Sequence, residues 1–323
     1  MIVRTASHVV PRPGRAVVVA ILATVLTALL PAVPAAAISS TACRVTNVGT
    51  GVVRTALAPA VTAAGKGDVL TVRGTCTGGI SIAKRIELRG VRPPGAGVPT
   101  IVGGALGPVL TIAEEGNVRI RSLTITGGTG TAAGEGHNGG GIYVDGRVVL
   151  TSVHVTNNAV DGAGGGIYSF GGTVILGGRS IVDANAANNG GGIEVGFGTL
   201  TIGGRTRIAD NTASTDGGGI AAGYAALTVN GRAVITGNSA AGRGGGIVII
   251  YGGAAIGGDA RITLNEAGAL LGAGGGIGKA IALRLARDGA TAAPSTPAQL
   301  LDTMRAELAK WSKVVKAAGL KMD

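Results

Sequence analysis

The chain has 323 residues, of which 61 are glycine, while only 14% are charged and 2% are aromatic. This composition excludes a disordered chain, which needs low hydrophobicity, and the glycines do not recur at every third position as in collagen. An ordinary α/β enzyme is disfavoured because few large side chains are available for a core. The net charge of +11 is distributed along the chain. No basic run is interleaved with aromatic residues, so nucleic acid is not an expected partner.

Residues 1–37 have the pattern of a signal peptide. Arg4, Arg12 and Arg15 precede an apolar run over 16–30, and the alanines at 35–37 fit a cleavage site. The apolar run is short for a membrane span, although an uncleaved anchor is the alternative. No later segment is long and apolar enough to cross a membrane. We therefore expect a secreted or cell-surface protein whose mature chain has no membrane span.

The two cysteines, Cys43 and Cys76, both follow this segment closely. In an exported protein they predict one disulfide, and two free thiols are the alternative. Two cysteines alone cannot close a zinc site. No other cluster of metal ligands stands out, so the sequence predicts no metal site.

Residues 38–271 are predicted to form the main domain, which begins with a cap. A short helix is expected within 52–64, covering an N-terminal end that would otherwise be an exposed sheet edge. Short β-branched runs then predict strands. These runs are 69–72, 80–82, 86–88, 109–112, 118–120 and 123–125.

An internal repeat of about 27 residues dominates the chain after residue 138. The tetrad Gly-Gly-Gly-Ile ends at Ile142, Ile167, Ile193, Ile220, Ile247 and Ile277. Two more aliphatic columns recur every 27 residues: Ile181, Ile208, Ile235 and Ile262, and Ile175, Ile202, Val229 and Ile256. Three short strands per repeat, separated by glycine turns, predict an all-β fold. The expected architecture is a right-handed parallel β-helix whose aliphatic columns stack inside, about 4.8 Å apart.

Two other columns follow the same repeat. The first consists of Asn158, Asn185, Asn211, Asn238 and Asn265. Stacked asparagines at a corner predict a hydrogen-bonded ladder, and a row of ligand groups is the alternative. The second consists of Phe170, Phe197, Tyr224 and Tyr251. Their rings are expected to stack as a packing ladder, and a surface that binds sugar faces is the alternative.

Residues 43 to about 265 resemble secreted parallel β-helix proteins of the pectin-lyase-like superfamily. The resemblance rests on Cys-Arg-Val-Thr-Asn at 43–47, Gly-Asp-Val-Leu-Thr-Val-Arg-Gly-Thr-Cys at 67–76, Leu-Arg-Gly at 88–90 and Leu-Thr-Ile-Thr-Gly-Gly at 123–128. It implies the same fold. It also implies one of two functions: a surface protein without a reaction, or a polysaccharide lyase or glycoside hydrolase.

An enzyme of that kind would group carboxylates and a basic residue on one face, in some members with calcium. The acids of the coils are Asp145, Asp161, Asp183, Glu194, Asp210, Asp216 and Asp259. Asp183 and Asp210 lie 27 residues apart and are the candidate catalytic pair. The coil histidines are His137 and His154, and nearby arginines are Arg179, Arg205 and Arg232. Ion pairs at turns are the alternative for these residues.

Residues 272–323 are predicted to form a helical tail, with helices at 277–288 and 297–318. Gly272, Gly276 and Gly278 resemble the glycine-rich first turn of short-chain dehydrogenases, which implies a nicotinamide-cofactor site. Too few residues follow for that fold, and the family's Tyr-x-x-x-Lys pair is missing, so no cofactor is expected. Residues 306–319 resemble the C-terminal helix of Bug-type solute-binding proteins.

These observations favour an exported, non-catalytic surface or structural β-helix protein, expected to be a monomer. An enzyme acting on polysaccharides is the alternative, and a nicotinamide-binding oxidoreductase fragment at the C-terminus is a more distant one. A cell-wall or extracellular polysaccharide is the partner that the resemblance implies.

Overall fold

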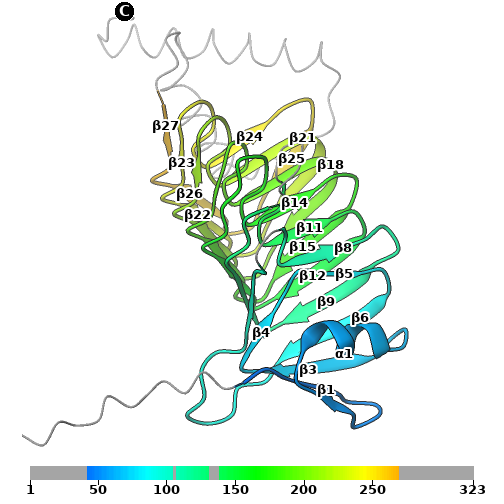
Figure 1. Cartoon of the computed structure of the whole chain (residues 1–323). Coiled ribbons are helices and arrows are strands. Elements are labelled where there is room, and N and C mark those ends of the chain that lie inside the picture. The colour runs from blue at the N-terminus through cyan, green and yellow to red at the C-terminus, as the bar shows by residue number, and fades with distance from the viewer. Residues whose placement is uncertain (1–41, 105–106, 131–137, 269–323) are drawn as a thin grey trace, which may run out of the picture. The chain divides into compact units, whose positions relative to one another are not determined.

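The computed structural model describes residues 42–104, 107–130 and 138–268, and these residues form a parallel β-helix (Figure 1). The predicted fold class, with coils of about 27 residues, is confirmed. Figure 1 shows the coils stacked in chain order, from β3 to β27. The predicted signal peptide at 1–37 and the predicted tail at 272–323 lie outside the described residues.

Each coil contributes one strand to each of three faces. The first face contains β5 (Ile80–Ile82), β8 (Leu110–Ile112), β11 (Ile142–Val144), β14 (Ile167–Ser169), the first halves of β18 (Ile193–Ile202) and β21 (Ile220–Val229), and β24 (Ile247–Ile249). The second face contains β3 (Val69–Arg73), β6 (Arg85–Gly90), β9 (Asn117–Arg121), β12 (Arg147–Thr151), β15 (Thr173–Gly177), the second halves of β18 and β21, and β25 (Gly253–Ile256).

The third face and one corner complete the coil. The third face contains β4 (Thr75–Thr77), β7 (Thr100–Val102), β10 (Thr124–Thr126), β13 (His154–Thr156), β16 (Ile181–Asp183), β19 (Arg207–Ala209), β22 (Val234–Thr236) and β26 (Arg261–Thr263). The corner contains β17 (Ala186–Ala187), β20 (Thr212–Ala213), β23 (Ser239–Ala240) and β27 (Glu266–Ala267). Strands within each of these four groups pair in parallel.

The core lies inside the coils, because alternate residues of every strand point inward. Ile142, Ile167, Ile193 and Ile220 follow one another in direct register on the first face, and each is 0% exposed. Ile247 continues the column and is partly buried. The prediction that this column lies inside is confirmed for these residues.

In two of the expected columns the first residue is wrong, because the residue that follows it in the sequence is the one that stacks inside. Ile208 stacks on Val182, and Ile181 faces outward beside Arg207. On the second face, Ile202 stacks on Leu176, and Ile175 faces outward beside Thr201. The coil that contains these residues is one residue shorter than the next, so a fixed interval of 27 selects the wrong side of the strand. The later members, from Ile208 and Ile202 onward, stack as expected.

The repeated glycines before each isoleucine are explained by their surroundings. Gly190 has a φ of +57°, a left-handed conformation that costs little only for glycine. A Cβ on Gly192 would lie 2.6 Å from the carbonyl oxygen of Gly219 in the next coil. The tetrad is therefore retained at this corner because the backbones of neighbouring coils approach too closely for side chains.

The N-terminal end is closed by elements that occur once. β1 (Arg44–Asn47) pairs antiparallel with both β3 and β2 (Val53–Arg54). The predicted helix is shorter than expected, as α1 (Leu57–Ala63), because residues before it are taken up by β2. The Lys84 ammonium donates to the carbonyl oxygens of Val61 and Ala64, at 3.2 and 2.9 Å, and so caps the end of α1.

The predicted disulfide is confirmed. Cys43 is bonded to Cys76, and their Cα atoms are 4.6 Å apart. Cys43 directly precedes β1, whereas Cys76 lies in β4 and is 0% exposed. The bond therefore ties the entry segment to the first strand of the third face.

The predicted asparagine ladder is also confirmed, and Asn211 illustrates its bonds. Its Nδ2 donates to the carbonyl oxygen of Val182 and to Oδ1 of Asn238, both at 2.9 Å. Its Oδ1 accepts from the backbone N and the Nδ2 of Asn185, at 3.1 and 3.0 Å. Asn211 is 0% exposed, and the same pattern links Asn158 through to Asn265. Each amide thus joins its own coil to a neighbour.

Candidate functional site

An aromatic column lies on the corner between the first and second faces. Ring centroids are 5.1 Å apart for Phe170 and Phe197, 5.2 Å for Phe197 and Tyr224, and 5.1 Å for Tyr224 and Tyr251. The last two pairs are stacked, at 5° and 13°, whereas Phe170 meets Phe197 edge-on at 82°. Ser169 pairs with Val195 in the register, so the next residue, Phe170, lies opposite Gly196 and not opposite Phe197.

The stacking limits what this column can bind. Phe197 and Tyr224 cover each other's ring faces, so the middle of the column presents ring edges to solvent. Tyr251, at 79% exposure, is the most open of the four. The predicted stacking is confirmed for Phe197 with Tyr224 and for Tyr224 with Tyr251, and it is wrong for Phe170 with Phe197. A sugar that stacks on a ring face would find one at the ends of the column, at Tyr251 or Phe170, and not between Phe197 and Tyr224.

A second cluster lies on the outward side of the first face. Tyr143, Tyr168 and Glu194 occupy equivalent positions in three successive coils, and the two tyrosine rings are 5.4 Å apart. Burial raises the pKa of Glu194 to about 7, and its Oε2 is buried without a hydrogen-bond partner. Burial, followed by the nearby Glu194 charge, raises the pKa of Tyr168 to about 12.

Asp145 lies at the rim of this cluster. Burial raises its pKa, a hydrogen bond from Tyr143 opposes the rise, and the charge of Glu114 adds to it. A carboxyl group that keeps its proton near neutral pH is suited to general acid catalysis, with an ionised carboxylate as its usual counterpart. The cluster brings two carboxyl groups with raised pKa values to the same tyrosine, because both Glu194 and Asp145 act on Tyr168.

Sequence reasoning named Glu194 and Asp145 only as members of a set of coil acids. A signal for the cluster was present, because Tyr143, Tyr168 and Glu194 each follow a Gly-Gly-Gly-Ile tetrad directly. The burial of Glu194 could not be predicted from the sequence, because it depends on how the preceding glycine turn packs against the Glu194 side chain. In the structure, a Cβ on Gly190 would lie 2.7 Å from Cβ of Glu194, so that turn lies against the strand.

The structure places Asp183 and Asp210 in separate interactions. Asp183 lies beside Ala209 in the register of the third face, and its Oδ1 is 2.7 Å from Nε2 of His154. Asp210 follows β19 in a left-handed conformation and accepts a hydrogen bond of 3.1 Å from Nη2 of Arg207. The register therefore sets the two carboxylates one position out of line.

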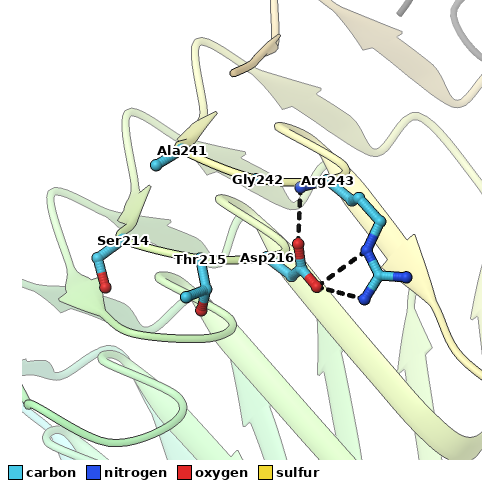
Figure 2. A pocket seen from close by; sticks show the side chains of 6 residues that line it. All are labelled: Ser214, Thr215, Asp216, Ala241, Gly242 and Arg243. Atoms are coloured by element: carbon cyan, nitrogen blue, oxygen red, sulfur yellow. Dashed lines mark hydrogen bonds and ion pairs between the residues drawn. The ribbon is translucent and has the colours of Figure 1, made fainter. Parts of the chain in front are cut away.

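A shallow hollow at another corner contains the best-defined ion pair, shown in Figure 2. Arg243 donates to Asp216 from its backbone N and from Nη2, both at 2.6 Å, and from Nε at 3.1 Å. These hydrogen bonds lower the pKa of Asp216. Ser214 and Thr215 also line the hollow, and their hydroxyls donate to Asn188 and Asn189 in the preceding coil, at 2.7 Å each. The polar groups here bond coil to coil.

Other expected sites fall partly outside the described residues. Gly272, Gly276 and Gly278 are not described, and neither is His137. In the described ranges, no three metal-binding side chains of His, Cys, Asp or Glu form a group. No helix among these residues is long and apolar enough to cross a membrane.

Comparison with known proteins adds no family to this description. No protein-family model, no curated protein and no solved structure matches the chain. What is established is therefore a parallel β-helix with an asparagine ladder and one disulfide.

Proposed function

We propose that the chain is an exported, non-catalytic β-helix protein that serves as a rigid surface or structural element. The observation that carries this proposal is the use of the repeated polar and aromatic side chains. The asparagine ladder, the aromatic column and the Asp216–Arg243 pair each bond one coil to the next. Side chains committed to these bonds stiffen the stack and are not free to bind and release a substrate.

Export is supported by two independent features. The Cys43–Cys76 disulfide is typical of proteins that fold in an oxidising compartment, and the pattern of residues 1–37 is that of a signal peptide. Expression of the full chain in a secreting bacterial host tests this. Medium or wall fractions should contain a chain whose N-terminus lies close to residue 38, with no free thiol. A chain retained in the cytoplasm with an intact N-terminus would contradict export.

A second candidate function is an enzyme of the pectin-lyase-like superfamily that acts on an acidic polysaccharide. The specific observation in its favour is Glu194, a half-buried carboxyl group with a pKa of about 7 beside Tyr168. Its fitness as a general acid makes it a better candidate than Asp183 or Asp210, which are held by His154 and Arg207.

An activity screen separates the two functions. The purified chain is incubated with acidic polysaccharides, with and without calcium, and chain cleavage is measured. The first proposal predicts no cleavage. Cleavage that is lost in Glu194→Gln but retained in Asp183→Asn/Asp210→Asn would establish the enzyme instead and assign its acid. Cleavage that is lost only in Asp183→Asn/Asp210→Asn would assign catalysis to that aspartate pair.

A further inference from the structure

Arginines gather on the outward side of β1 and of the first four strands of the second face. In these strands the aliphatic residues point inward except for Val69 and Val149, and half of the outward positions are arginine. The residues are Arg44, Arg73, Arg85, Arg89, Arg119, Arg121 and Arg147, and all are exposed. We call this surface the arginine face.

The positive charge of the arginine face is largely unpaired. Glu87 is the one carboxylate at its outward positions, and its Oε1 lies 2.8 Å from Nη2 of Arg89 and 3.5 Å from Nε of Arg121. No ion pair joins the other five arginines to a carboxylate in the part of the chain that the structure describes. In the register Arg44 lies beside Arg73, Arg89 lies beside Arg121, and Glu87 lies opposite Arg119. Neighbouring strands are about 4.8 Å apart, so the guanidinium groups of the two arginine pairs repel each other unless an anion lies against them.

The same face changes character in later coils. From β15 onward its outward positions are occupied by Thr, Ile, Ala and Gly. On this face the arginines are therefore confined to the early coils, although all coils share the same backbone geometry. Later coils carry exposed arginines as well, such as Arg179 and Arg205, but these lie at turns and not on the second face.

The arginine face is suited to binding a flat partner that carries an array of anionic groups. Its positions lie on one sheet face, and none of these arginines lines the hollow at Asp216 and Arg243 or the hollow beside α1. No aromatic ring occupies an outward position there, so it has no platform for stacking nucleic-acid bases. What remains is charge with the planar, two-pronged donor geometry that guanidinium groups offer to phosphate and to carboxylate groups, and a bilayer surface presents phosphates as a flat array.

We propose that the arginine face binds the phosphate headgroups of an anionic phospholipid bilayer and so holds the β-helix flat against a membrane surface. Each arginine near such a surface contributes attraction that decays within a Debye length, about 8 Å at physiological salt. Several arginines acting together give reversible, salt-sensitive binding without insertion. This inference goes beyond the proposed function, since binding to vesicles does not depend on whether the chain is exported or catalytic.

Cosedimentation of the purified chain with vesicles tests the proposal. The probes are vesicles of phosphatidylcholine alone and vesicles of equimolar phosphatidylglycerol and phosphatidylcholine. Binding is expected only to the second kind and should fall steeply as salt is added. Arg73→Gln/Arg119→Gln should weaken the binding constant about 30-fold, which corresponds to about 2 kcal/mol. Neither arginine has an ion-pair partner to lose, and the melting temperature of the variant checks that it folds.

Two further variants make the result specific. Arg179→Gln/Arg205→Gln removes the same charge from exposed turns in later coils and should weaken binding less than threefold. Arg73→Lys/Arg119→Lys keeps the charge and should restore most of the binding. Equal losses in the two glutamine variants would overturn the proposal in favour of a net-charge effect. Binding to polygalacturonate or DNA that is stronger than to vesicles, and lost in Arg73→Gln/Arg119→Gln, would overturn it in favour of that polymer.

Discussion

The coils before residue 130 and those after residue 138 are stabilised in different ways. The early coils are closed by the antiparallel strands β1 and β2, by α1 with its Lys84 cap, and by the Cys43–Cys76 bond. The later coils use one asparagine and, at another corner, one aromatic ring in each turn. Where the sequence repeats, a single side chain in register can bond every coil to the next. Where it does not, the fold depends on contacts that occur once.

The two ends of the described stack also differ in how completely their apolar residues are buried. At the N-terminal end α1 lies over the core, and Leu57 and Leu70 are 1% and 0% exposed. In the last described coil Leu264 is 78% exposed, and Ile256 and Ile262 are only partly buried. Whether the predicted tail at 272–323 covers this end stays a prediction, because those residues are not described.

Breaking the asparagine ladder should have the largest effect. Asn211→Ala removes four buried hydrogen bonds to Val182, Asn185 and Asn238, and it leaves the backbone N–H of Asn185 without its acceptor. We expect a loss of about 3–5 kcal/mol in the free energy of unfolding, measured by urea denaturation. The matched control is Asn117→Ala at an exposed outward position, which should change stability by less than about 0.5 kcal/mol. Similar losses in both variants would show that the ladder adds little.

Glu194→Gln should have an effect that depends on pH. The folded-state pKa of about 7 lies above the ordinary value of 4.5, so between these values the folded chain binds more protons than the unfolded one. Stability from this group is therefore lost as pH rises from about 4.5 through 7, by about 3 kcal/mol in total.

Removing the carboxyl group should remove that loss. Glu194→Gln should raise the melting temperature by several degrees at pH 8 and by little at pH 4, as measured by circular dichroism. Glu115→Gln, which changes an exposed turn, is the control and should not reproduce this dependence. A variant whose advantage is the same at both pH values would contradict the burial of an uncompensated carboxylate.

Replacing either of two buried serines in one coil should change the stability least, and the two changes should have opposite signs. Ser169 Oγ is buried without a hydrogen-bond partner, whereas Ser180 Oγ donates to the carbonyl oxygen of Gly177 at 2.8 Å. Ser169→Ala should stabilise the chain by about 1 kcal/mol, and Ser180→Ala should destabilise it by about 1 kcal/mol. Calorimetry of both variants checks this, and a shared sign would refute the assignment of Ser169 as unpaired.

The fold was predictable because the signals that specify it are periodic. The Gly-Gly-Gly-Ile tetrads and the asparagine column mark positions where every coil has the same requirement. The one-residue error at Ile181 and Ile175 arose where the coil length changes, and no local residue marks that change. The hairpin of β1 and β2 was missed because its pairing is decided by tertiary contacts with β3.

The candidate sites were less predictable. Asp183 and Asp210 were paired by the same interval of 27, and the shorter coil separates them. The cluster around Glu194 depends on burial by a glycine turn, and the arginine face depends on which side of each strand faces outward. Both are properties of the register and of neighbouring coils. Spacing in the sequence indicates them only after the coil boundaries are known.

The comparison of the two regions is tested most directly by residue-resolved hydrogen exchange in oxidised and reduced protein. The disulfide closes a loop of 33 residues, which corresponds to about 4 kcal/mol in the chain-entropy model. Reduction should therefore speed exchange in β1, β3 and β4 while the amides of Asn185 and Asn211 stay protected. A Cys43→Ala/Cys76→Ala variant should show the same pattern without reductant. Loss of protection spread evenly over both regions would contradict the view that each is held by its own contacts.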